Sequence, residues 1–237
     1  MWLSLTRGSK DRLTLTDQKS IWPAPDGSDA ELVITTEAQL TQEVILVTPR
    51  VVRLSYTVDQ IRATLTLDDG RPAPWPDAQP VKGKGFEIMI TERGALVVPV
   101  QGERLQNKQA IWLDTVAEGI RSAWIVPPHD AEPGREWKLT PIMPGGLPPG
   151  TKSLDFDVSY RLQQLDGPNA HVTVVFAMKF VLDTKPQVGT GVGKGDMTVR
   201  IDRSGGVSEA HRTGRVELLR TATRHQILRS NMDLRRL

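Results

Sequence analysis

The chain offers few side chains with the spacing that catalysis or metal binding requires. Its four histidines, His129, His171, His211 and His225, are scattered, and no two stand at the spacing of paired metal ligands. It has no cysteine, which excludes thiolate chemistry, disulfides and cysteine-based zinc sites. No Gly-x-Ser-x-Gly motif places a serine nucleophile on a strand-to-helix turn. The sequence therefore predicts neither a metal nor a cofactor, and it favours binding over catalysis.

Asp155 and Asp157 are the carboxylates best placed to act together. They stand two residues apart in an alternating segment, so both side chains project from the same face of one strand. Such a pair can serve acid–base catalysis or supply half of a calcium site. More often it is a solvated strand face that protects a sheet edge from unwanted pairing, and this is the interpretation favoured here.

The glycine-rich segment VGTGVGKGD at 188–196 has the composition of a phosphate-binding loop but not its spacing. A Walker loop needs a glycine five positions before its Gly-Lys pair, and that position is Val188, while Gly195 occupies the serine or threonine place. The residues that follow alternate like a strand, whereas a phosphate loop opens a helix. The glycines therefore predict a bulge or a close crossing of strands rather than nucleotide binding.

Composition and alternation predict a β-rich globular protein. The chain has 237 residues, of which 38% are hydrophobic and 24% charged, as in ordinary globular proteins. Most segments alternate apolar and polar residues, which is typical of strands with one buried face. No apolar run reaches the roughly 18 residues of a transmembrane helix. We expect a mainly antiparallel β fold with one central amphipathic helix, arranged as two-lobed curved sheets or half-barrels.

Two pairs of similar segments indicate an internal duplication. GKGFEIMITERG at 83–94 matches GKGDMTVRIDRSG at 193–205, and LSYTVDQ at 54–60 matches VSYRLQQ at 158–164. The matches occur in the same order, which makes coincidence improbable. The spacing is longer than that of solenoid repeats, so two paired lobes are expected rather than a stacked array.

Residues 107–125 form the one stretch with helical periodicity, because apolar residues recur there on a single stripe opposite a polar face. We expect a joining helix over 107–126 between a first β-rich repeat over 1–106 and a second over 127–237, packed as one unit. Large rings gather around this helix, where they can line a lipophilic pocket. The predicted ligand-binding residues are Trp112, Val116, Ile120, Trp124 and Trp137.

Basic charge is concentrated near the end of the sequence. The net charge of +2 is too small to indicate a nucleic-acid binder. Residues 211–237, however, hold seven arginines against two acidic residues. Beside the binding of a lipophilic small molecule, this predicts a second class of function, an interaction scaffold that docks an acidic partner such as an envelope protein. Its predicted contact residues are Arg212, Arg215, Arg220, Arg224, Arg229, Arg235 and Arg236.

The segment IVPPHDAEPGREWKL at 125–139 carries a family resemblance. An amphipathic helix runs into prolines, a short spacer and Gly134-x-x-Trp137, which opens a strand, and similar glycine-lysine strands occur in both halves. This arrangement resembles a family of uncharacterised bacterial envelope lipoproteins with duplicated β-rich halves. The resemblance implies an exported protein of the cell envelope, periplasmic or tethered by a lipidated cysteine outside this sequence, rather than a cytoplasmic one. It implies a location more than a mechanism.

Overall fold

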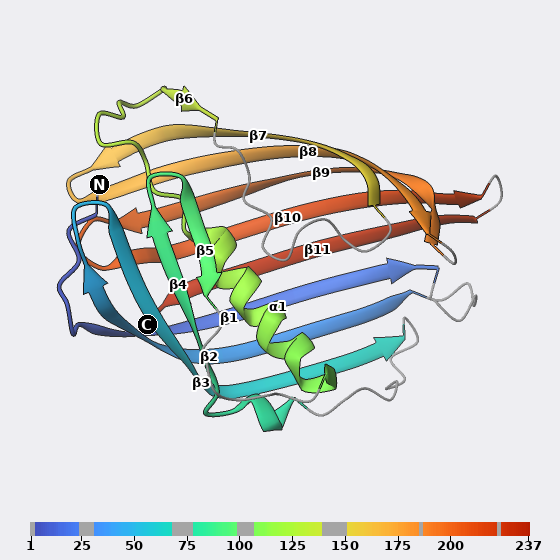
Figure 1. Ribbon diagram of the computed structural model, residues 1–237, viewed down its shortest axis with the longest axis horizontal. Helices are drawn as coiled ribbons and strands as arrows, with labels where there is room; N and C mark the ends of the chain where they lie inside the picture. The colour runs from blue at the N-terminus through green and yellow to red at the C-terminus, as the bar shows by residue number, and fades with distance from the viewer. Residues whose placement is uncertain are drawn as a thin grey trace.

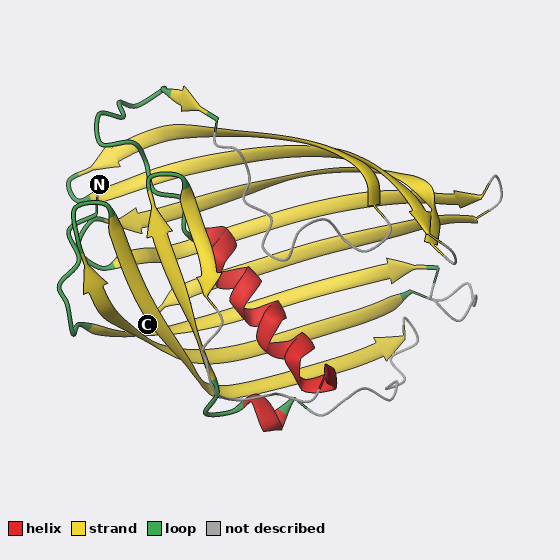
Figure 2. Cartoon of the chain, viewed as in Figure 1, coloured by secondary structure: helices red, strands yellow, loops and turns green. Residues whose placement is uncertain are grey.

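The computed structural model describes residues 3–23, 31–67, 78–98, 107–138, 151–184, 187–221 and 224–237. They form one open, curved, antiparallel sheet of eleven strands, with one α-helix against the concave face (Figures 1 and 2). The prediction of a mainly antiparallel β fold with one helix is confirmed. The two halves of the chain do not form separate sheets, because β strands from both halves pair with each other in a single sheet.

The strands form a meander in each half of the chain. The first half contains β1 (Lys10–Trp22), β2 (Leu32–Val47), β3 (Val51–Leu67), the 3-10 turn η1 (Gln79–Val81), β4 (Gly85–Thr91) and β5 (Gly94–Val98). Helix α1 (Asn107–Ala123) follows. The second half contains β6 (Glu136–Trp137), β7 (Thr151–Asp166), β8 (Asn169–Thr184), β9 (Gln187–Asp202), β10 (Gly206–Thr221) and β11 (Arg224–Arg236). The order in the sheet is β5-β4-β3-β2-β1-β11-β10-β9-β8-β7-β6, so β1 and β11 join the halves at the middle.

The similar segments lie on strands with different neighbours. In the first half they occupy β3 and β4, which pair directly, whereas in the second half they occupy β7 and β9, with β8 between them. The match in sequence order therefore does not extend to strand order, and the internal duplication stays a prediction. The joining helix ends at Ala123, a few residues before the predicted boundary, with a tight last turn in which Trp124 N–H donates to the Arg121 carbonyl at 3.1 Å.

Alternation along each strand places a row of apolar side chains under α1 on the concave face, which we call the inner face. The residues that pair with one another from strand to strand across seven strands are all buried and apolar. The register brings the apolar positions of each strand to the same side of the sheet. This row runs through Ala38, Leu15, Leu234, Ala210, Val199, Val172 and Leu162. Most of the core therefore lies between this row and α1.

Two bulges between β2 and β3 help to curve the sheet around the helix. Asp59 of β3 and Ile45 of β2 are extra residues at the two register shifts between these strands. Each bulge increases the local twist and bends its strand. The sheet curls so that α1 contacts β1 and β11 as well as β4, β5 and η1 (Figure 1).

Asp202 fixes the turn between β9 and β10. Its Oδ1 accepts hydrogen bonds from the Ser204 N–H at 2.7 Å, the Ser204 hydroxyl at 2.8 Å and the Gly205 N–H at 3.1 Å. Its Oδ2 lies 3.4 Å from Arg236 Nη2, on the central strand β11. Partial burial opposes the charged form, but the hydrogen bonds from Ser204 and Gly205 and the charge of Arg236 outweigh it and lower the pKa of Asp202.

The substitution Asp202→Asn should reduce the free energy of unfolding by about 1–2 kcal/mol near neutral pH, because the charge-assisted hydrogen bonds are lost. A pKa that is lower in the folded state gives stability that is present above the ordinary value of about 4 and is lost as the pH falls through the folded value. The difference between wild type and variant should therefore shrink in acid. Urea unfolding near pH 7 and near pH 3 measures it, and equal differences at both would contradict this account.

Candidate functional site

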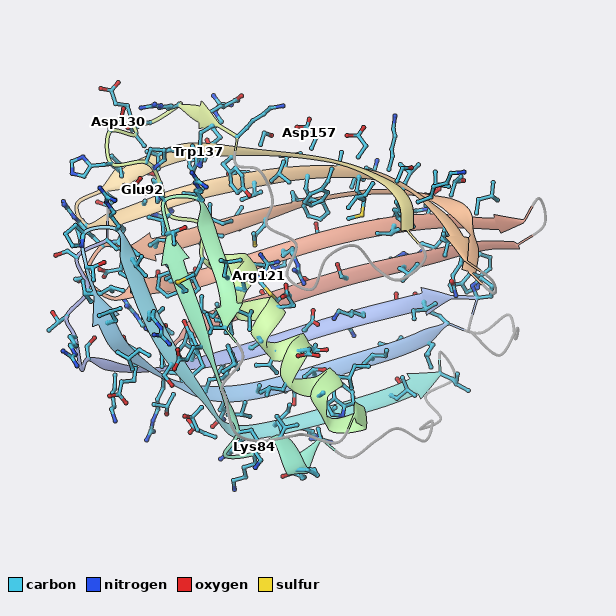
Figure 3. The ribbon with its side chains drawn as sticks, in the orientation of Figure 1. Lys84, Glu92, Arg121, Asp130, Trp137 and Asp157 are labelled. Atoms are coloured by element: carbon cyan, nitrogen blue, oxygen red, sulfur yellow. The ribbon has the colours of Figure 1, made fainter. Side chains whose placement is uncertain are left out.

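Four of the five predicted ligand-binding residues belong to the hydrophobic core. Trp112, Val116, Ile120 and Trp124 are each no more than 3% exposed, between α1 and the sheet. A ligand would reach them only if α1 left the sheet. The fifth, Trp137, is half-buried at the sheet edge, where its ring stacks on Tyr160 with centroids 5.7 Å apart (Figure 3).

Trp124 closes one end of the curved sheet. Its Nε1–H donates to the Tyr56 hydroxyl at 2.8 Å, and that hydroxyl donates to Gln42 Oε1 at 2.7 Å. Burial raises the pKa of Tyr56 well above its ordinary value. The Trp124 ring also covers Gly206, where an added Cβ would lie 2.2 Å from the indole. Trp124 therefore links β3 to β10, and Tyr56 is a core tyrosine whose hydroxyl bonds to the side chains of Trp124 and Gln42.

Beyond the helix, the inner face is apolar and only half-buried. The sheet extends past α1 at the end where β1 finishes and β11 begins (Figure 1). Cross-strand register places one row of large apolar side chains there, which we call the distal apolar face. It comprises Leu67, Leu32, Ile21, Leu228, Val216, Met178 and Phe156, of which Leu32 alone is buried and the others are partly exposed.

In the glycine-rich segment, the backbone of β9 lies directly beneath large side chains of the neighbouring strand β8. Added Cβ atoms would lie 2.1 Å from the Phe180 ring at Gly191, 2.7 Å from Met178 at Gly193 and 2.4 Å from the Phe176 ring at Gly195. The side chains of β8 thus lie across the bare backbone of β9. The predicted bulge is wrong, because β9 keeps its register with β8 through these positions. The close approach involves side chains of β8 and, at Gly195, the backbone of β10.

Gly195→Ala should destabilise the fold by about 2 kcal/mol or more, because overpacking forces the backbone to move. The new methyl group would stand 2.3 Å from the carbonyl oxygen of Thr213, which cannot rotate away as a side chain can. Lys194→Ala, on the neighbouring exposed position of the same strand, is the matched control and should change stability little. Chemical denaturation of both variants checks this, and equal stabilities would contradict it.

An open groove of about 820 Å³ lies on the opposite, outer face of the sheet. Val175, Lys194, Arg215 and Arg229 line it, and they occupy register positions that face away from α1. Arg229 Nη1 donates to Glu31 Oε1 at 2.9 Å across its rim. We call this hollow the outer groove. None of the five predicted ligand-binding residues lines it.

The arginines near the end of the sequence do not form one cationic patch. Arg212 and Arg236 have inner-face register positions, whereas Arg215, Arg229 and Arg235 face outward. Each of these five arginines lies near a carboxylate of the same chain. On the inner face, Arg212 is 3.7 Å from Asp17 and Arg236 is 3.4 Å from Asp202. On the outer face the pairs are Arg215 with Glu217 at 2.8 Å, Arg229 with Glu31 at 2.9 Å and Arg235 with Glu209 at 3.6 Å. The side chains of Arg220 and Arg224 lie outside the described residues. Docking of an acidic partner by this set stays a prediction.

Asp155 and Asp157 are exposed on the outer face of β7, next to the edge strand β6. Asp157 Oδ1 accepts a hydrogen bond from Lys138 Nζ at 2.8 Å (Figure 3). That bond and the charge of Asp157 raise the pKa of Lys138. Among the described residues, no group of three or more histidine, aspartate or glutamate side chains could hold a metal ion. The arrangement matches a solvated strand face.

Comparisons with known proteins show the fold but no family. No protein-family model matches the chain, and no curated protein matches it. A structure of lipovitellin, described for its lipid–protein interactions, is similar over 99% of this chain, with a TM-score of 0.62 and 11% identity. The chain spans 25% of that lipovitellin chain. At this level of identity the likeness establishes a shared fold.

A second structure, an outer membrane channel from Pseudomonas putida F1, aligns with 100% of this chain and 98% of its own. The TM-score is 0.24 and the identity 9%, so this match adds no argument about fold or function. In the described residues, no helix has the length and apolar character needed to cross a membrane.

Proposed function

We propose that the protein is a non-catalytic binding protein that holds a lipophilic ligand on the distal apolar face. The observation that carries this proposal is the row of large, half-buried apolar side chains on the concave side of the sheet beyond α1. Concave, mostly apolar surfaces are the usual sites for such ligands. Each methylene of an acyl chain buried there would contribute about 0.8 kcal/mol before the costs of association.

Two further observations support the proposal. The shared fold with lipovitellin is relevant because that structure is described for its lipid–protein interactions. The glycines of β9 leave room for Phe176, Met178 and Phe180 over the backbone of that strand, which adds apolar surface to this half of the inner face. The ligand class also suits the cell envelope, and we propose that location, periplasmic or lipid-anchored, on the strength of the family resemblance at residues 125–139.

The test compares the same substitution on the two faces of the sheet. Val216→Asp places a carboxylate on the distal apolar face, and Val175→Asp places one in the outer groove, where Val175 is 54% exposed. Binding of a fatty acid that carries a fluorophore is titrated against both variants and wild type, with circular dichroism to confirm folding. We expect Val216→Asp to weaken binding at least about tenfold, because a buried charge without a partner is costly.

Val175→Asp should bind as wild type does. If Val175→Asp weakens binding and Val216→Asp does not, the ligand lies in the outer groove and the proposed site is wrong. If the wild-type protein binds no fatty acid, the proposed function itself is wrong.

A further inference from the structure

A band of polar side chains crosses the inner face between the core under α1 and the distal apolar face. Register places Thr36, Asp17 and Arg212 in one row across β2, β1 and β10, with Met232 of β11 between Asp17 and Arg212. Lys19 follows Asp17 on the same face of β1. We call Asp17, Lys19, Thr36 and Arg212 the polar band. Asp17 and Thr36 are only 2% and 1% exposed, so the band is built into the fold.

The hydrogen bonding of the polar band is incomplete. Asp17 Oδ1, Thr36 Oγ1 and Arg212 Nε are buried and have no hydrogen-bond partner among the described residues. Arg212 Nη1 donates to the Ser122 hydroxyl at 3.2 Å, but Nη2 lies 3.7 Å from Asp17 Oδ1, which is too long for a hydrogen bond. Buried polar atoms nearly always have a partner. Two of these three atoms, Thr36 Oγ1 and Arg212 Nε, carry hydrogens, so this face holds hydrogen-bond donors that no described residue uses.

The charges of the polar band favour an anion. Lys19 Nζ lies 2.9 Å from Asp17 Oδ2, and Arg212 adds a second cation, so the band carries one positive charge more than its carboxylate neutralises. On α1 above it, Arg121 and Glu118 form a balanced pair at 2.7 Å (Figure 3 labels Arg121). Burial lowers the pKa of Arg212, and Asp17 opposes this shift. The Arg212 cation is therefore largely desolvated and only partly compensated.

The Nε and Nη2 groups of Arg212 offer the geometry that oxyanions require. These two N–H groups lie side by side on one edge of the guanidinium plane, where a carboxylate or phosphate can accept from both. Arg212 and Lys19 keep 21% and 43% of their side chains exposed, so a ligand can reach these two cations, and it reaches the buried Nε of Arg212 when the guanidinium turns toward it. Asp17 lies between the two cations, with Oδ2 at 2.9 Å from Lys19 Nζ and Oδ1 at 3.7 Å from Arg212 Nη2.

We propose that the polar band binds the anionic head group, a carboxylate or a phosphate, of an amphiphile whose chain lies on the distal apolar face. The inference rests on the proposed function, and it adds the chemical class of the ligand. Arg212 donates two hydrogen bonds to the head group, and Lys19 contributes charge. The apolar row begins next to the band, since Ile21 is two residues beyond Lys19 on the same face of β1.

The test compares ligands that share a chain and differ in the head group. Dissociation constants are measured for palmitate, hexadecanol and a palmitoyl lysophosphatidic acid by displacement of a fluorescent probe. Wild type should bind palmitate at least about tenfold more tightly than hexadecanol, because an ionic bidentate contact is lost with the alcohol. Arg212→Met should remove that preference and leave hexadecanol binding unchanged. Arg215→Met, which alters an outward-facing arginine of the same strand, should keep the preference.

The outcomes separate the two proposals. Equal affinity of wild type for palmitate and hexadecanol overturns the head-group site while the proposed function stands, and no affinity for either overturns both. A preference that survives in Arg212→Met, or is lost in Arg215→Met, also overturns the assignment. Tighter binding of the lysophosphatidic acid than of palmitate supports a phosphate head, and the reverse supports a carboxylate. The wild-type comparison decides the matter even if Arg212→Met fails to fold.

Discussion

Removal of Asn231 to Leu237 should unfold the protein. Residues 231–236 form the second half of β11, which pairs with β1 on one side and β10 on the other at the centre of the sheet. Met232 and Leu234 are fully buried, and loss of each such side chain costs about 2–5 kcal/mol. Two core side chains and two ladders of hydrogen bonds together are comparable to the whole stability of a domain, about 5–15 kcal/mol.

Circular dichroism and urea unfolding of the truncated chain measure this effect. The control is a full-length variant with Arg229→Gln and Arg235→Gln, two exposed outward arginines, which should stay folded because exposed ion pairs contribute at most about 1 kcal/mol each. A truncated protein that melts cooperatively at the wild-type temperature would contradict the central place of β11. Because truncation should unfold the protein, the predicted docking of an acidic partner by these arginines is tested by substitution.

Trp124→Ala should reduce the free energy of unfolding by about 3–5 kcal/mol, which is typical for a buried tryptophan. The indole fills the space between Tyr56 of β3 and Gly206 of β10, and its loss would leave a cavity at the closed end of the sheet. The Tyr56 hydroxyl would also lose the hydrogen bond from Nε1. Urea unfolding gives the magnitude.

Trp124→Phe is the matched variant, because it keeps an aromatic ring and removes the N–H donor. It should reduce the free energy of unfolding by less than Trp124→Ala does, because it leaves a smaller cavity. If the two variants were equally stable, the ring would not be filling a packed site. If neither differed from wild type, the link between β3 and β10 through Trp124 would be wrong.

Local pattern was sufficient to predict the elements of this fold, because burial repeats with the period of each element. Alternating residues predicted the strands, and the stripe of Trp112, Val116 and Ile120 predicted the helix. The pairing of β1 with β11 could not be predicted in the same way, since it joins opposite ends of the chain and depends on long-range packing. The same stripe also predicts a ligand site, yet an amphipathic stripe mainly indicates which face of a helix packs against the core.

The features of the candidate site left signals in the sequence that were not interpreted as a site. Gly191, Gly193 and Gly195 alternate with period two, as do Phe176, Met178 and Phe180, and this match is typical of large side chains that lie over a glycine strand. Asp17 and Arg212 occupy the apolar phase of their strands, after Leu15 and Ala210 respectively. A charged residue at a position where the alternation calls for an apolar one indicates that a charge lies on the buried face of the sheet. Its missing hydrogen bonds, however, are visible only in the folded structure.

Native mass spectrometry of the protein purified without detergent tests the central claim most directly. After incubation with a lipid extract and removal of excess lipid, we expect one amphiphile per chain, which solvent extraction releases and identifies as an anionic species. The adduct should be absent from Val216→Asp and present on Val175→Asp. A wild-type protein that keeps its bare mass after the same incubation would contradict the account.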